Sequence, residues 1–287
     1  MFKPSSLLKN IYIYQSIRFY SNNNYQQDSK SYFGFKSMSE SEKFQNVNSV
    51  FSKVANKYDI MNDCMSLGIH RLWKEYFVKE LMPIEGGSYL DVAGGTGDIA
   101  FKMLKYIKES RSVLKIPKND ATSITICDIN PHMIKNGKQK CKKIFNELDQ
   151  TIFKWEIMDA ENLSFEDNSF DSYTISFGIR NCVHIEKVLE EAYRVLKPGG
   201  RFLCLEFGKV NLPLIRDLYK IYSFNIIPVL GHLIAGDWNS YQYLVESIEK
   251  FPSQEKFKTM IINAQFSDVT YKNLSLGIAV ISSGFKI

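Results

Sequence analysis

The sequence predicts an α/β fold built on a doubly wound parallel sheet, and three observations support this prediction. Short apolar runs alternate with stretches of helical periodicity through the middle of the chain, a pattern typical of parallel strands joined by helices. The first run of the series, 88–92, leads into a glycine-rich turn at 94–97. Two apolar runs near the end of the chain are joined by a short connection, which predicts an antiparallel hairpin at one edge of the sheet.

Two amphipathic helices are expected before the sheet. Apolar side chains recur at helical spacing over 44–58, and a second helical stretch covers 70–81 until Pro83 and the Gly86-Gly87 turn end it. We expect the first helix to pack on or over the functional site.

The sheet itself is expected to contain five parallel strands and a closing hairpin. The parallel strands are predicted at 88–92, 122–127, 151–157, 170–176 and 200–206. The helices between them are predicted at 97–109, 130–147 and 184–196. Pro198 and Gly199 end the last of these helices. The hairpin strands are predicted at 266–271 and 278–283.

Composition limits the classes of partner. The chain has 287 residues with 45% hydrophobic content, enough for one full domain core. Its formal net charge is +5, but residues 1–20 hold three basic residues and no acid, so the remainder, with 33 basic and 31 acidic residues, is nearly neutral. Enzymes that act on nucleic acid usually carry a basic stripe in the folded part. We therefore expect no nucleic-acid partner.

The first 36 residues are expected to be a mitochondrial transit peptide without ordered structure. They are poor in acid, carry spaced basic residues among aliphatic ones, and lack the continuous apolar core of a secretory signal. An ordinary disordered leader is the alternative. We expect the folded domain to cover 37–287.

The cysteines do not predict a metal site or a disulfide framework. The five are dispersed, without a C-x-x-C pair. Cys127 and Cys204 lie inside apolar runs, so we expect them to be buried thiols.

An insertion of about 211–250 is expected after the fifth parallel strand. Its segment 221–235 is the most apolar stretch after the leader, but it is shorter than the roughly 20 residues that span a bilayer. A broken pair of apolar helices here would suit a lid over a hydrophobic substrate or a face resting on a membrane. A buried core helix is the alternative.

The glycine-rich turn predicts a nucleotide-cofactor site. Asp91 ends the first strand and Gly94 and Gly95 follow, so a ligand can approach the backbone closely. The spacing fits neither the dinucleotide fingerprint nor the phosphate loop. The acid would repel a pyrophosphate and attract an amino group or a cationic ligand, and S-adenosylmethionine offers both. A merely tight connection is the alternative.

Three further strand ends carry polar side chains at the edge where ligands bind in doubly wound sheets. Asp128 follows the second strand and could accept hydrogen bonds from both ribose hydroxyls, or it could only cap the helix that begins at Pro131. Asp159 and Ala160 follow the third strand, where they could contact the adenine ring.

The segment 176–181 follows the fourth strand, the position closest to the transferred group in such folds. Arg180 remains protonated at any working pH, so its expected role is to stabilise an oxyanion. A structural salt bridge is the alternative.

Several segments together resemble one enzyme family, the ubiquinone and menaquinone biosynthesis C-methyltransferases. They comprise 51–74, DVAGGTGD at 91–98, DIN at 128–130, DAENLSFEDNSFDSYTISFGIRN at 159–181, YRVLKPGGRFLCLEF at 193–207 and DWNSYQYLVESIEKFP at 237–252. The resemblance covers residues 44–287. It implies a class I S-adenosylmethionine-dependent methyltransferase fold, in which a Rossmann-like doubly wound sheet ends in an antiparallel hairpin.

The resemblance also implies roles for individual residues. The family binds S-adenosylmethionine through positions that hold Thr96, Asp128, Asp159 with Ala160, and Ser176 in this chain. Asp159 is a departure, because bacterial relatives often have Asn there.

On the substrate side, we expect Arg180 to be the oxyanion partner, with Asn181, Tyr58 and His70 as further contacts. His70 has a suitable unperturbed pKa for a base, although a lone histidine is more often structural.

The reaction implied is C-methylation of a polyprenyl benzoquinol ring in ubiquinone biosynthesis. Together with the leader, this suggests a mitochondrial enzyme that contacts the matrix side of the inner membrane peripherally, because its substrate is insoluble. Other subunits of a ubiquinone-biosynthesis complex and a second copy of the chain are further expected partners. The alternatives are a demethylmenaquinone or other small-molecule methyltransferase, and a cofactor-binding scaffold of such a complex.

Overall fold

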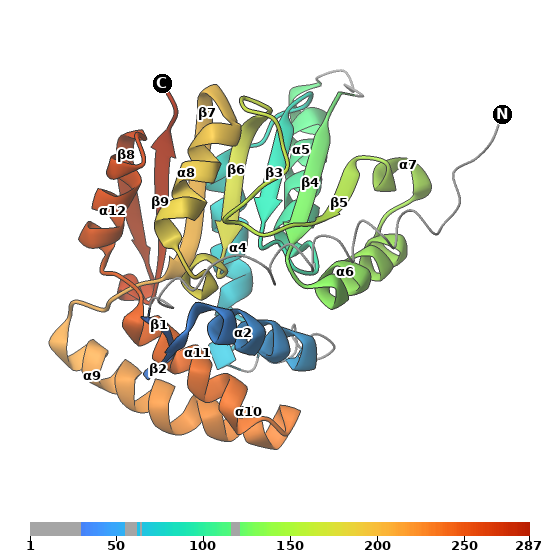
Figure 1. The fold of residues 1–287 in the computed structure, drawn as a ribbon. Helices are drawn as coiled ribbons and strands as arrows, with labels where there is room; N and C mark the ends of the chain where they lie inside the picture. Colours follow the sequence, from blue (N-terminus) through green and yellow to red (C-terminus); the bar gives the residue numbers. More distant parts are fainter. Residues whose placement is uncertain (1–29, 55–61, 64, 116–120) are drawn as a thin grey trace, which may run out of the picture.

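A computed structural model describes residues 30–54, 62–63, 65–115 and 121–287 (Figure 1). Its centre is a seven-stranded sheet in the order β5-β4-β3-β6-β7-β9-β8. The strands are β3 Ser88–Val92, β4 Ser123–Asp128, β5 Phe153–Ile157, β6 Phe170–Ser176, β7 Leu196–Phe207, β8 Ser267–Leu274 and β9 Ala279–Phe285. The first five run parallel, and β9 pairs antiparallel with both β7 and β8. The predicted doubly wound sheet with a closing hairpin at its edge is confirmed.

Helices cover both faces of this sheet (Figure 1). Helices α4 Ile69–Leu81, α5 Asp98–Leu114 and α6 Pro131–Ile144 pack on one face, and α8 Ile185–Val195 and α12 Gln254–Asn263 pack on the other. The central strands are apolar on both sides because each face is buried against helices. Cys127 and Cys204 are buried in the sheet, as predicted.

Several predicted boundaries differ from the observed ones. Helix α5 continues to Leu114, where the left-handed residue Lys115 ends it, instead of stopping near 109. The helix predicted over 130–147 is divided, because α6 ends at Ile144 and the short helix α7 Glu147–Gln150 starts again with its own cap from Asn146. Strand β7 begins before residue 200, because Leu196 already pairs with Phe170.

An N-terminal hairpin corrects the predicted start of the folded domain. Strands β1 Lys30–Phe33 and β2 Lys36–Ser39 pair antiparallel, although 30–36 was expected to belong to a disordered leader. The Phe33 ring stacks on Tyr243 with centroids 3.9 Å apart. The Phe35 N–H donates to Glu246 at 2.9 Å. The hairpin is ordered because it packs on a helix more than 200 residues away in sequence. Residues 1–29 lie outside the described part of the chain.

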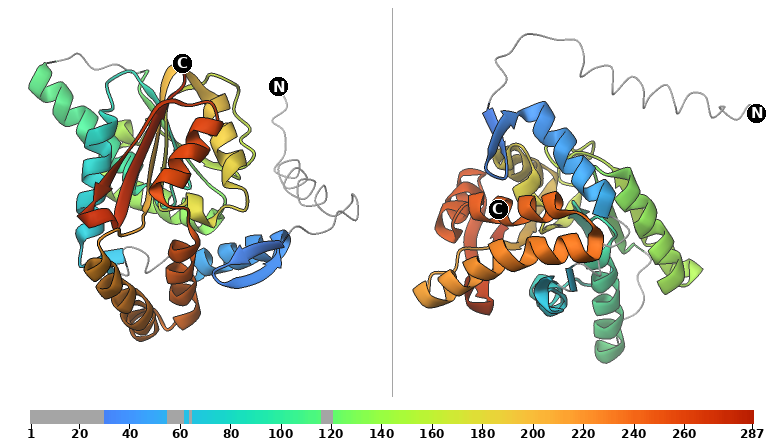
Figure 2. Two further views of the ribbon diagram at one scale, coloured as in Figure 1. Left: turned by 90° about the vertical axis from the view of Figure 1, so that its left-hand side faces the viewer. Right: turned by 90° about the horizontal axis from the view of Figure 1, so that it is seen from below.

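The segments around the sheet's carboxyl edge are helical. Helix α2 Glu40–Val54 confirms the first predicted helix over its described residues, and 55–58 lie outside them. The predicted insertion contains α9 Pro213–Ile221, a π-helical turn Tyr222–Ile226, α10 Ile227–Ala235 and α11 Trp238–Lys250. Figures 1 and 2 show α2 and α9–α11 together at one end of the sheet. The segment 221–235 buries Ile227, but Ile226, Val229 and Leu233 are exposed, so the alternative of a buried core helix is wrong for this segment as a whole.

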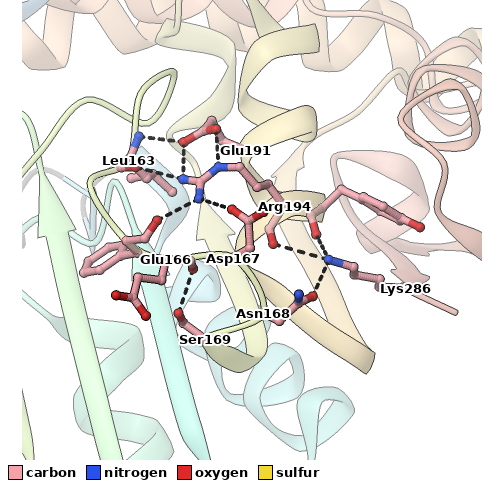
Figure 3. Close-up of polar contacts among 10 residues, drawn as sticks. Leu163, Glu166, Asp167, Asn168, Ser169, Glu191, Arg194 and Lys286 are labelled. Carbon is pink, nitrogen blue, oxygen red and sulfur yellow. Dashed lines mark hydrogen bonds and ion pairs between the residues drawn. The ribbon is translucent and has the colours of Figure 1, made fainter.

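Part of the family-like segment 159–181 has a structural role far from that end. Arg194 of α8 donates to the carbonyls of Leu163 and Phe165 and pairs with Glu191 and Asp167 (Figure 3). These contacts fix the loop between β5 and β6 on α8. Lys286 adds hydrogen bonds to the Asn168 side chain and to the carbonyls of Tyr193 and Arg194.

Candidate active site

Two neighbouring cavities lie at the carboxyl edge of the parallel strands. The first, called the inner cavity, has a volume of about 130 Å³ and is lined by the ends of β3, β4 and β6 and by α2. The second, called the outer cavity, has a volume of about 260 Å³ and is lined mainly by apolar residues of α4 and of the insertion. Phe51, Lys74, Phe177 and Asn181 line both cavities, so the two meet at these residues.

All the sequence-predicted cofactor residues are brought together in the inner cavity. They are Asp91, Gly94, Gly95, Thr96, Asp128, Asp159, Ala160 and Ser176. They come from four strand ends that are far apart in sequence, and the parallel topology places those ends side by side.

At the glycine loop the backbone itself borders the inner cavity, with no side chain between them. A Cβ atom on Gly94 would lie 2.7 Å from Cγ2 of Ile126 and 2.9 Å from Oδ2 of Asp91, so no larger residue fits there. Gly95 has φ +55°, a left-handed conformation that favours glycine.

Asp91 is fully buried at the base of the loop. Its Oδ1 accepts a hydrogen bond of 2.9 Å from Thr174, while its Oδ2 has no hydrogen-bond partner among the described residues. Burial raises the pKa of Asp91 to about 7. The Ser176 hydroxyl is also buried and without a partner in the described part of the chain. Buried polar atoms are normally satisfied, so both atoms indicate a polar ligand.

Asp128 organises the neighbouring strand end. Its Oδ2 accepts the Gly95 N–H at 2.9 Å and its Oδ1 accepts the Asn130 N–H at 2.8 Å. Burial raises its pKa to about 6. Each oxygen keeps a second lone pair, so the carboxylate can still accept from ligand hydroxyls.

The alternative that Asp128 caps α6 is wrong. The cap is Asn130, whose Oδ1 accepts from the N–H groups of His132 and Met133 at 2.9 and 3.3 Å. Its Nδ2 donates to the Ser52 hydroxyl at 2.9 Å, which fastens α2 over the inner cavity.

Asp159 and Ala160 form the wall after β5. The Asp159 carboxylate accepts the Glu161 N–H at 2.9 Å, and burial raises its pKa. Ala160 lines the inner cavity with only a methyl side chain, so a flat ligand ring can approach the backbone at this position.

Arg180 lines the outer cavity and also belongs to a buried ion pair. Its Nη1 lies 2.9 Å from Oε1 of Glu206, and the two side chains are 6% and 3% exposed. Its Nε donates to the Ser247 hydroxyl at 3.3 Å. The pKa of Glu206 is raised by burial, although the Arg180 charge opposes this shift. The salt bridge that the sequence offered as an alternative therefore exists, in a residue that also faces the cavity.

Asn181 and His70 both line the outer cavity. The Asn181 Oδ1 accepts a 2.9 Å hydrogen bond from the Tyr243 hydroxyl. His70 Nε2 contacts Asp63 at 2.9 Å, and its Nδ1 is buried without a hydrogen-bond partner among described residues. Burial and the nearby Lys74 charge lower the His70 pKa. Tyr58, the remaining predicted substrate contact, lies outside the described residues.

The sequence did not predict Lys74, Asp98 or Tyr243 as parts of the site. Lys74 Nζ pairs with Oδ2 of Asp98 at 2.8 Å at the junction of the two cavities. Lys74 and Asp98 both lie within the family-like segments, and this was the only sign in the sequence that they matter. Their pairing depends on the packing of α4 against α5.

No group of three or more His, Cys, Asp and Glu side chains among the described residues is arranged to hold a metal ion. None of the helices described is both long and apolar enough to cross a bilayer.

Residues 37–286 match the model of the ubiE/COQ5 methyltransferase family. The chain belongs to this family. Related proteins named mitochondrial 2-methoxy-6-polyprenyl-1,4-benzoquinol methylase are 52% identical in Mus musculus, 52% in Homo sapiens and 50% in Drosophila melanogaster. The alignments cover 90%, 90% and 91% of this chain and 85%, 85% and 86% of those proteins.

Solved structures share the fold of this ubiE/COQ5 family member. A SAM-dependent methyltransferase from Thermotoga maritima is 19% identical, with a TM-score of 0.55, over 84% of this chain and all of that one. Phosphoethanolamine N-methyltransferase 2 of Haemonchus contortus in complex with S-adenosyl-L-methionine is 15% identical, with a TM-score of 0.52, over 75% of this chain and 52% of that one. The class I methyltransferase fold expected from the sequence is confirmed.

Proposed function

We propose that the protein is a mitochondrial S-adenosylmethionine-dependent C-methyltransferase that converts 2-methoxy-6-polyprenyl-1,4-benzoquinol to its 5-methyl product in ubiquinone biosynthesis. The observation that carries this proposal is the roughly 50% identity to enzymes named for that reaction over 90% of the chain. The two adjoining cavities support it, because the inner cavity has polar groups for a nucleoside and the outer cavity is mainly apolar, as a prenylated ring requires.

The inner cavity fits S-adenosylmethionine. The unpartnered Oδ2 of Asp91 can accept from an ammonium group, and Asp128 can accept from ribose hydroxyls. Asp159 can accept from the adenine amino group beside the small Ala160. When bound, this cofactor supplies an electrophilic methyl group on a positively charged sulfonium.

Arg180 is proposed to stabilise the negative charge that develops on a ring oxygen of the quinol. Its guanidinium is held by Glu206 and Ser247, so it is preorganised before substrate arrives. A more negative oxygen pushes electron density onto the ring carbon, which is otherwise a weak nucleophile. Holding the ring in attack geometry supplies a further reduction in the barrier, roughly 7–11 kcal/mol in favourable cases.

Asn181 and His70 are proposed to complete the substrate side. Tyr243 orients Asn181, which can contact the ring where the cavities meet. His70 is the candidate base, because its lowered pKa keeps it neutral near pH 7 and able to accept the phenolic proton. Tyr58 is retained as a substrate contact on the resemblance alone.

The proposed cellular location rests on the insoluble prenylated substrate and on the relatives, which are named as mitochondrial. We propose a transit peptide that ends before Lys30 and peripheral attachment to the matrix side of the inner membrane. The insertion is the proposed lid and membrane-facing part, since Leu214, Leu218 and Leu233 are 73%, 57% and 73% exposed near the outer cavity. Other subunits of a ubiquinone-biosynthesis complex and a second copy of the chain are proposed partners. Light scattering of the purified protein tests whether two copies of the chain form a dimer.

Turnover with defined quinols tests the proposed reaction. The purified chain beginning at Lys30 is supplied with S-adenosylmethionine and, under reducing conditions, with short-chain 2-methoxy-6-prenyl-benzoquinol or demethylmenaquinol. We expect methylation of the benzoquinol, with Arg180→Ala reducing kcat at least about 100-fold. Preference for demethylmenaquinol would replace the substrate assignment. Cofactor binding without methylation of either quinol would favour a scaffold role.

A further inference from the structure

Lys74 is the one cationic side chain among the described residues that line the inner cavity. Five carboxylates line the same cavity, from Asp91, Asp98, Asp128, Asp159 and Glu161. The Lys74 side chain is 7% exposed, so its charge acts in a poorly hydrated environment. Such an excess of acid opposes any anionic ligand group unless a cation receives it.

The methyl donor carries such an anionic group. Its α-amino acid portion is a zwitterion, with an ammonium and a carboxylate on one carbon. The unpartnered Oδ2 of Asp91 suits the ammonium and cannot bind the carboxylate. Lys74 acts on the charge of Asp91 and pairs with Asp98 at 2.8 Å, so a cation lies beside the anionic base of the glycine loop.

We propose that Lys74 binds the carboxylate of the methyl donor's amino acid portion, opposite Asp91, an inference that rests on the proposed function. Asp98 then positions the Lys74 ammonium. Burial acts to raise the pKa of Asp98, but the contact with Lys74, together with the charges of Lys140 and Lys102, holds it below its ordinary value. Because Lys74 also lines the outer cavity, the carboxylate contact fixes the donor at the point where the ring arrives.

Two ligands that differ only in the amino acid portion test this assignment. S-Adenosylhomocysteine carries that portion, and 5′-methylthioadenosine has the same nucleoside thioether without it. Calorimetry on the chain beginning at Lys30 gives the Kd of both ligands. We expect Lys74→Met to weaken S-adenosylhomocysteine binding at least about tenfold and to leave 5′-methylthioadenosine binding unchanged. Lys102→Met is the matched control, because Lys102 also joins α5 to α4 through Glu75 at 3.4 Å but lines neither cavity.

Two more outcomes separate a direct contact from indirect effects. Removing Lys74 leaves Asp98 without this partner, and that charge could repel the ligand carboxylate. The double variant Lys74→Met/Asp98→Asn removes both charges, and we expect it to keep the weakened S-adenosylhomocysteine binding. Recovery of normal binding in the double variant, or equal weakening of both ligands by Lys74→Met, would overturn the inference. Failure of the unaltered protein to bind either ligand would instead contradict the proposed function, and the inference with it.

Discussion

Single residues in the site combine deep burial with charge. Asp91, Asp128 and Glu206 are carboxyl groups whose pKa values burial raises. Asp91 receives only one side-chain hydrogen bond, so its ionised form is costly in the free protein. A ligand ammonium would remove much of that cost, which makes cofactor binding dependent on the ionisation of this group.

We therefore predict that cofactor affinity depends on pH through Asp91. With a pKa of about 7, Asp91 is mostly ionised at pH 8 and mostly protonated at pH 6. The affinity for S-adenosylhomocysteine, measured by calorimetry, should fall about tenfold as the pH is lowered from 8 to 6. In Asp91→Asn the affinity at pH 8 should be lower and this dependence absent, with a smaller change near pH 6 from Asp128. An unchanged pH profile in the variant would contradict the role of Asp91.

The same substitution is predicted to stabilise the free protein at alkaline pH. Between the unfolded pKa near 4 and the native value of about 7, the native state binds a proton that the unfolded state has lost. Stability of the free protein therefore falls as pH rises through this window. Asp91→Asn should raise the free energy of unfolding at pH 8 by on the order of 1–3 kcal/mol, measured by denaturant titration. Destabilisation of the variant at pH 8 would oppose this view.

Glu206 is predicted to act by positioning Arg180. Glu206→Gln leaves the buried guanidinium without its counter-charge, which should cost about 3–5 kcal/mol of stability. The kcat should fall at least about tenfold, while the Kd of S-adenosylhomocysteine stays unchanged because neither residue lines the inner cavity. Normal kcat in a folded variant would show that the ion pair is only structural.

At the scale of elements, the N-terminal hairpin holds the substrate side of the site. Phe33 stacks on Tyr243, and the Tyr243 hydroxyl holds Asn181. Phe35 lies against Phe224 of the π-helical turn with centroids 6.2 Å apart. A short segment directly after the leader thus supports a residue where the two cavities meet.

Removal of the hairpin is predicted to weaken the fold. A chain beginning at Glu40 loses the Phe33 stacking and the Phe35 contacts, so it should unfold several degrees below a chain beginning at Lys30. Phe33→Ala in the longer chain is the finer test and should cost about 1–3 kcal/mol. Thermal unfolding measures both. Equal melting temperatures for the two chains would contradict a supporting role.

Apolar patterning was sufficient to predict most of the sheet, because the central parallel strands β3, β4, β6 and β7 are buried on both faces and therefore form distinct apolar runs. That the candidate cofactor residues line one cavity was also predictable, since the carboxyl ends of parallel strands meet at one edge of the sheet. Contacts between residues far apart in sequence were not predictable. The hairpin 30–36 packs on Tyr243, and the position of Lys74 depends on its pairing with Asp98 across two helices. Nor did spacing show that Asn130, two residues after Asp128, would cap α6.

At the scale of the whole molecule, the site opens beside an apolar surface. Leu214 and Leu218 lie one turn apart on α9 and are exposed, with Arg216 and Lys220 on the same helix. Exposed apolar side chains suit the interface of a bilayer, although Arg216 and Lys220 are paired with Asp217 and Glu249. A prenylated quinol could then pass from the bilayer to the outer cavity without crossing water.

We predict that this surface binds membranes. Leu214→Glu/Leu218→Glu should reduce co-sedimentation with anionic vesicles at least about tenfold, because two apolar side chains become charged. Turnover of a soluble short-chain quinol should be unchanged, since neither residue lines a cavity. Undiminished vesicle binding would place the membrane contact elsewhere.

The most direct test of the central claim is the position of the transferred methyl group. The chain beginning at Lys30 is incubated with S-adenosylmethionine carrying a ¹³C-methyl group and a reduced short-chain 2-methoxy-6-prenyl-benzoquinol, and the product is examined by NMR. The account predicts a ¹³C-methyl signal on the ring carbon, which Arg180→Ala should reduce at least about 100-fold in an equal time. A ¹³C-methoxy signal, or no labelled product from protein that binds the cofactor, would contradict C-methylation of this quinol.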